Sequence, residues 1–137
     1  MKHLIIFLVA ILIGPSLALA NLGDDDDAIE RVYGNLVQRH LLDDGTVTTL
    51  YHKDRYLYFV VFNKGRSVLE KYSRTDGHEL SRKEIARFLK ANSARGTWTQ
   101  RETPKGGGFE RSDHKAEATS SEIDGRPAFV IKALNKK

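Results

Sequence analysis

The feature that most restricts the fold of this chain is a run of seven apolar residues near its middle, Tyr56 to Phe62. A short run rich in aromatic and β-branched side chains predicts a strand, because most helices of globular domains are longer. Turn residues bound the run on both sides. We therefore predict an antiparallel meander whose middle strand is central and covered on both faces. The three predicted strands are residues 46–52, 56–62 and 67–73.

A first helix is predicted directly before this meander. Apolar residues recur at helical spacing from residue 29 onward, after a run of four aspartates at 24–27. Such acids stabilise a helix N-terminus, where the helix dipole favours negative charge. Gly34 leaves two alternatives: the helix ends at Tyr33 and an extended or irregular segment follows, or it continues to about Leu42. We favour the shorter helix.

The clearest local signal predicts a second helix. Ser81 is a favourable N-cap, and Glu84 three residues later completes a capping box. Leu80 and Ile85 can pack across this cap as a hydrophobic staple. We expect this helix to extend to about Ala91.

Weaker strand patterns follow the second helix. We interpret Gly106 to Gly108 as a flexible hairpin loop between two of these strands. Trp98 is expected to anchor the strands against the second helix, and an exposed Trp98 on a binding face is the alternative. The predicted strands are residues 97–101, 108–111, 115–120 and 127–134.

The predicted element order is α-β-β-β-α-β-β-β. Whether the second half contains a fourth strand is not decided by the sequence. This order lacks the regular β-α-β alternation of parallel sheets, so it predicts an α+β fold with antiparallel sheet and two helices. Each half consists of a helix followed by a meander. That similarity hints at a duplicated module.

The N-terminal residues have the pattern of a secretory signal peptide. Lys2 precedes ten apolar residues at 4–13, and Ala18-Leu19-Ala20 forms a small-x-small cleavage motif. Ten apolar residues are too few for a membrane span, which needs about 20. We therefore predict cleavage after Ala20 and export to the periplasm or the medium, with no membrane span in the mature chain. The predicted domains are a signal peptide at 1–20 and a single α+β domain at 21–137, whose segment 21–28 is acidic.

The composition excludes several classes of protein. The chain has no cysteine, which rules out disulfides, thiol chemistry and a lipid-attachment cysteine. Charge is unevenly distributed, because residues 21–44 carry net −5 and residues 45–137 carry net +8. The mature chain would have a net charge of only +3, so we do not expect nucleic acid as a partner.

No recognisable catalytic, cofactor or metal motif is present. His40, His52, His78 and His114 are scattered without the close spacing that local zinc sites show. The aspartates at 24–27 lack the remaining ligand positions of a calcium-binding loop. We therefore predict no catalytic residues, no cofactor and no metal ligands.

Aromatic and basic side chains gather on the predicted meander, and they define a candidate interaction surface. Interleaved aromatics and cations can grip single-stranded nucleic acid. Strand alternation makes these tyrosines at least as suited to the core, however. We expect the surface to bind another envelope or extracellular protein, without enzymatic activity. Its candidate residues are Tyr51, Arg55, Arg66, Lys71, Tyr72 and Arg74.

The alternative function is that of a small secreted cysteine-free hydrolase, such as a nuclease. It would need a glutamate base, a histidine acid and arginine clamps. A Glu and a His within about 7 Å of each other in a concave basic pocket would favour the enzyme. A flat or convex sheet with these residues scattered would favour the interaction module. The candidate residues are Glu70, His52, His78, His114, Arg66 and Arg74.

Residues 26–74, with a short helix ending at Tyr33-Gly34 and the meander around Tyr56 to Ser67, resemble a known half-module. It is the helix-plus-three-strand unit of outer-membrane assembly lipoproteins and β-lactamase inhibitor proteins. The resemblance implies a periplasmic or secreted fold whose sheet face binds another protein. The chain lacks the cysteines of both families, so no binding residue is carried over. It is otherwise similar to small exported bacterial proteins without an assigned activity.

Overall fold

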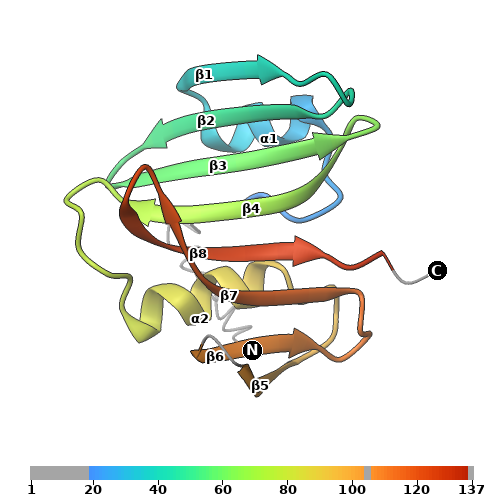
Figure 1. The fold of residues 1–137 in the computed structure, drawn as a ribbon, viewed down its shortest axis with the longest axis vertical. Coiled ribbons are helices and arrows are strands. Elements are labelled where there is room, and N and C mark those ends of the chain that lie inside the picture. The colour runs from blue at the N-terminus through green and yellow to red at the C-terminus, as the bar shows by residue number, and fades with distance from the viewer. Residues whose placement is uncertain (1–18, 104–105, 136–137) are drawn as a thin grey trace, which may run out of the picture.

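The computed structural model describes residues 19–103 and 106–135. The described residues form two helices and eight strands (Figure 1). In chain order these are α1 (Asp26–Tyr33), β1 (Leu36–Leu41), β2 (Val47–Lys53), β3 (Tyr56–Asn63), β4 (Arg66–Arg74), α2 (Arg82–Ala91), β5 (Trp98–Thr103), β6 (Gly106–Arg111), β7 (Ala116–Ile123) and β8 (Arg126–Ala133).

All eight strands belong to one antiparallel sheet, in the order β1-β2-β3-β4-β8-β7-β6-β5. The chain thus consists of two halves, each a helix followed by a four-stranded meander, which meet where β4 pairs with β8. The predicted order α-β-β-β-α-β-β-β is therefore wrong, since each half contains four strands. The broader prediction of an antiparallel α+β fold holds.

The strand missing from the prediction is β1. Every residue from Leu36 to Leu41 is exposed, so the segment has no alternation of buried and exposed side chains that a sequence pattern could reveal. The shorter alternative for the first helix is confirmed, because α1 ends at Tyr33. Gly34 follows with a φ of +69°, a left-handed conformation that favours glycine.

The predicted helix starts are also confirmed. Asp25 is the N-cap of α1, and its carboxylate accepts a hydrogen bond from the Ala28 N–H at 2.8 Å. In α2, Ser81 and Glu84 form the complete capping box. Trp98 anchors β5 against this helix, since its indole N–H donates to the Leu89 carbonyl at 2.7 Å.

Both helices lie on the same face of the sheet (Figure 1), and the hydrophobic core fills the space between. Its centre is a continuous aromatic cluster. Tyr33 of α1 stacks on Tyr58 of β3 at 4.0 Å between ring centroids, and Tyr72 of β4 stacks on Phe88 of α2 at 4.0 Å. Because the second pair joins the two halves, the core is shared between them.

Two further predictions need correction. Gly106 to Gly108 belong to strand β6, in register with β5, and are not a loop. Strand β3 is an interior strand as expected, but only alternate residues are buried, which face the helices. Its other face is only half-buried. The sheet therefore has one covered face and one open face.

Among the described residues, no helix has the length and apolar character needed to cross a membrane.

Candidate functional site

The open face of the sheet carries apolar side chains that no helix covers. Across strands β2, β3 and β4, the register places Leu50, Phe59 and Lys71 side by side on this face. All three are half-buried. Strand alternation explains their position, because their neighbours Tyr51, Tyr58 and Tyr72 point the opposite way into the core.

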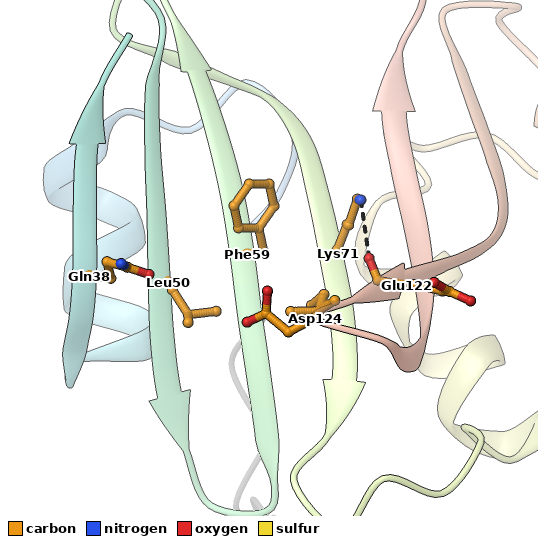
Figure 2. Close-up of a pocket in the computed structure, with 7 residues that line it drawn as sticks. Gln38, Leu50, Phe59, Lys71, Glu122 and Asp124 are labelled. Carbon is orange, nitrogen blue, oxygen red and sulfur yellow. Dashed lines mark hydrogen bonds between the residues drawn. The ribbon is translucent and has the colours of Figure 1, made fainter.

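The end of the β7–β8 hairpin turns this open face into a groove. It reaches across β4, and the Lys71 ammonium donates to the Glu122 carbonyl at 3.2 Å (Figure 2). Ile123, the last residue of β7, is buried. The resulting groove has a volume of about 240 Å³ and is lined by Gln38, Leu50, Phe59, Lys71, Glu122, Ile123 and Asp124.

The groove has an apolar floor and a charged rim. Leu50, Phe59 and Ile123 provide the floor. The Lys71 ammonium lies 5.7 Å from the centroid of the Phe59 ring, within the range of a cation–π contact. In Figure 2 the Asp124 side chain lies between Leu50 and Lys71, below the Phe59 ring. This arrangement suits an apolar side chain flanked by polar groups, as occurs at protein interfaces.

The residues predicted as an interaction surface do not form one surface in the structure. Tyr51 and Tyr72 are buried in the core, at 1% and 0% exposure. Arg74 forms ion pairs with Asp76 and Glu84. Of the six, only Lys71 lines the groove. Arg55 and Arg66 are exposed, in the β2–β3 turn and at the start of β4.

The residues proposed for a hydrolase are also dispersed. Glu70 is fully buried in the core, whereas His52 and His78 are exposed on β2 and on the loop before α2. His114, however, lies beside a glutamate that sequence reasoning missed. Its Nδ1 is 2.7 Å from Glu110 Oε1. The only sequence signal for this pair is its spacing of four residues, which brings side chains together on a helix. Here Glu110 lies at the end of strand β6 and His114 in the turn after it, so the spacing did not predict the contact.

This Glu110–His114 pair belongs to a shallow pocket of about 180 Å³ near the β5 edge. Arg101 forms an ion pair with Glu110, and Arg111 lines the same pocket. The condition that favours an enzyme, a Glu and a His within about 7 Å in a concave basic pocket, is therefore met here. With its Nδ1 held by a carboxylate, a histidine can exchange a proton through Nε2.

Other features of the pocket fit a structural ion-pair cluster. The Glu110 side chain is only 10% exposed and contacts both Arg101 and His114. Ser112 also lines the pocket, and its hydroxyl oxygen accepts a hydrogen bond from the Thr97 N–H at 3.1 Å. The carboxylate thus links two neighbouring strands and the following turn.

A second buried carboxyl group lies in the core. Glu70 accepts a hydrogen bond from the Tyr72 hydroxyl at 2.7 Å, and the Asn92 amide donates to that hydroxyl at 3.1 Å. Burial raises the pKa of Glu70 to about 8, and the negative charge of Asp24 adds to this effect. The group is covered by protein, so it is not accessible to a substrate. Among the described residues, no group of three or more potential ligands is arranged to hold a metal ion.

Comparisons with known proteins assign the chain to no family. No family model matches it, and neither does any curated protein. Among solved structures, it is similar to a cysteine-rich secretory protein from Staphylococcus aureus subsp. aureus Mu50, with a TM-score of 0.47 and 10% sequence identity. The match covers 82% of this chain and 44% of that chain, so the present chain spans less than half of its length.

Proposed function

We propose that the chain is exported and that its mature form is a non-enzymatic protein-binding module. The observation that carries this proposal is the groove on the open sheet face. Leu50 and Phe59 on its apolar floor are partly exposed to a partner, in contrast to the aromatic core on the other face. Sheet faces that expose apolar side chains beside charged ones commonly mark protein interfaces.

Three arguments support a protein as the partner. The groove is small and open, which suits one or two inserted side chains better than an enclosed small molecule. Leu50 and Phe59 can pack against an apolar side chain, while Lys71 and Asp124 can pair with its polar neighbours. The resemblance of residues 26–74 to half-modules of inhibitor proteins also implies a sheet face that binds protein.

The test begins with capture of partners from the organism's own envelope fraction or culture fluid. The mature chain is the bait, and mass spectrometry identifies what it retains. The affinity of each retained protein is then measured for wild type, Phe59→Asp and Val61→Asp. Both substitutions place a carboxylate on the open face of β3, but only Phe59 lines the groove.

We expect Phe59→Asp to weaken binding by a factor of about 30 or more, the loss typical of a central interface residue. Val61→Asp should change affinity by less than about 5-fold, because Val61 is not among the residues that line the groove. Equal loss in both variants would contradict the groove as the centre of the interface. Retention of no protein, together with turnover of RNA or glycans by the pure chain, would contradict a binding module.

A second candidate function is hydrolysis at the Glu110–His114 pair. It is favoured by the 2.7 Å contact between these residues in a pocket with two arginines. Turnover of RNA and of glycan substrates is measured for wild type, His114→Ala and the exposed control His78→Ala. Hydrolysis here requires a loss of about 100-fold or more in His114→Ala only, the usual range for a general acid or base. Equal activity in all three proteins would exclude this site.

A further inference from the structure

Strand β1 lies at an edge of the sheet and carries exposed apolar side chains. In Figure 1 it lies at the top of the sheet, beside β2. Among the described residues, the large hydrophobic side chains that are exposed all belong to this strand or directly follow it. They are Leu36 at 43%, Val37 at 60%, Leu41 at 76% and Leu42 at 45% exposure. Burial of such a patch against a partner is favourable.

The backbone of β1 is also available for pairing on its outer side. The Leu42 N–H donates to the Thr46 carbonyl at 2.9 Å, so the backbone of Leu42 faces the strand that follows. These directions alternate along an antiparallel strand, and the register with β2 is regular from Gln38 to Leu41. The N–H and C=O groups of Arg39 and Leu41 therefore point away from β2. Among the described residues, no strand pairs with that side. Unpaired groups of this kind are a template for another strand.

The order of side chains along β1 fits a second copy of the same strand. From Leu36 to Leu42, the residue after the strand, the chain has two apolar, three polar and two apolar residues. This pattern reads the same in both directions, with Arg39 at its centre. When two copies pair antiparallel about a two-fold axis at Arg39, Leu41 lies opposite Val37 of the second copy, and the outermost leucines also meet. An interface between identical copies requires such self-complementarity, because each contact occurs twice.

The charge at the centre of this pairing is compensated. A two-fold axis at Arg39 brings two guanidinium groups together, which is unfavourable for arginines without partners. Each Arg39, however, donates a hydrogen bond to Asp26 of α1 at 2.6 Å. This bond raises the pKa of Arg39, and the negative charge of Glu30 adds to the effect. Each copy thus provides two carboxylates near its arginine, so the two arginines can approach each other.

We propose that β1 pairs antiparallel with β1 of a second copy about a two-fold axis at Arg39, which makes the protein a dimer. The two sheets then form one continuous sheet. Opposite residues of an antiparallel pair project to the same face, so the open faces of the two copies lie on the same side. The dimer therefore presents both grooves lined by Phe59 and Lys71 to the same side. The inference does not depend on the proposed function of these grooves.

The first test is cysteine cross-linking, which is simple because the chain has no cysteine. The pairing about Arg39 places Gln38 of one copy opposite His40 of the other, within the distance that a disulfide spans. Gln38→Cys and His40→Cys are each expressed from the complete sequence, purified, and oxidised alone and as an equimolar mixture. Non-reducing electrophoresis measures the covalent dimer. We expect at least about 5-fold more dimer in the mixture than in either variant alone. Equal yields in all three samples, or no covalent dimer in any, would overturn the proposed pairing.

The second test measures self-association by sedimentation velocity from micromolar to millimolar protein. Leu41→Pro removes an N–H that points away from β2, so it opposes pairing between copies without removing a bond within the sheet. Gln100→Lys, at an exposed position of the edge strand β5, is the control. We expect Leu41→Pro to raise the dimer dissociation constant at least about 10-fold and the control to leave it unchanged. A wild type that stays monomeric, as when only a different protein covers this edge, would overturn the inference. A dimer that forms equally well in both variants would also overturn it.

Discussion

At the scale of single residues, Glu70 is a carboxyl group held inside the hydrophobic core. It is fully buried, its carboxyl group accepts one hydrogen bond from Tyr72, and burial raises its pKa to about 8. In the unfolded chain the same group has its ordinary pKa of 4.5. At a pH between these two pKa values, Glu70 is protonated in the folded state and ionised in the unfolded state. The free energy of unfolding therefore falls as the pH rises through this window.

We predict that Glu70→Gln removes this dependence on pH. The wild type should lose roughly 3 to 5 kcal/mol of stability between pH 5 and pH 8, while the variant changes little, because an amide does not ionise. Urea unfolding at pH 5, 6.5 and 8 measures the difference. Glu79→Gln, at an exposed position, is the control. A variant that loses stability as steeply as the wild type would show that other groups cause the dependence.

Lys71 and Tyr72 show which part of the candidate site a sequence can predict. Both were expected on one interaction surface, yet adjacent strand residues point to opposite faces. Only the fold decides which face the helices cover, so the sequence could not assign Lys71 to the groove and Tyr72 to the core. The groove also depends on Ile123 and Asp124, which lie some 50 residues from Lys71 along the chain.

At the scale of elements, the N-terminus of α2 combines capping with tertiary contacts. The Glu84 carboxylate accepts a bond from the Ser81 N–H at 2.9 Å, forms an ion pair with Arg74 at 3.3 Å and accepts the Tyr56 hydroxyl. Burial alone would raise the pKa of Glu84, but these bonds, that from the Ser81 backbone first, outweigh it and lower the pKa. One side chain thus joins the helix to strands β3 and β4.

We predict a graded loss of stability at this helix start. Ser81→Ala should cost about 1 kcal/mol, because it removes only the cap. Glu84→Ala should cost about 2 to 3 kcal/mol, since it also leaves Tyr56 without its acceptor. Lys83→Ala, on the exposed side of the same turn, should have little effect. Urea unfolding at pH 7 ranks the three variants, and equal costs for Ser81→Ala and Glu84→Ala would contradict the tertiary role.

The elements that sequence could predict are those with strong local signals. The capping box fixed the start of α2, Gly34 fixed the end of α1, and the apolar run fixed β3. Strand β1 lacked such a signal because all of its residues are exposed. The glycines of β6 were misassigned since their strand is specified by pairing with β5 rather than by their own propensity.

At the scale of the whole molecule, the two halves should unfold together. They share the β4–β8 pairing and the stacking of Tyr72 on Phe88. The sequence provides a separate optical probe for each half, because its five tyrosines all precede α2 and its single tryptophan follows it. We predict coincident transitions from tyrosine near-UV circular dichroism and Trp98 fluorescence.

Phe88→Ala should lower the free energy of unfolding measured by both probes by the same amount, about 3 to 5 kcal/mol. The reason is that it removes the aromatic ring shared by the two halves. Phe59→Ala removes the same ring on the open face and should cost less. Separate midpoints for the two probes in the wild type would show that each half is an independent folding unit.

The two ends of the sheet differ in their side chains. Strand β1 exposes Leu36, Val37 and Leu41, the last at 76%, whereas β5 presents mainly polar residues at the other end. Unpaired strand edges can recruit further strands, and charged or polar edges resist this. Among the edges that the described residues form, only that of β1 is receptive, so edge-to-edge association at high concentration ends once a single partner is added. Crowded solutions of this protein should therefore yield finite pairs rather than growing filaments, and Leu41→Lys should keep them monomeric in sedimentation experiments.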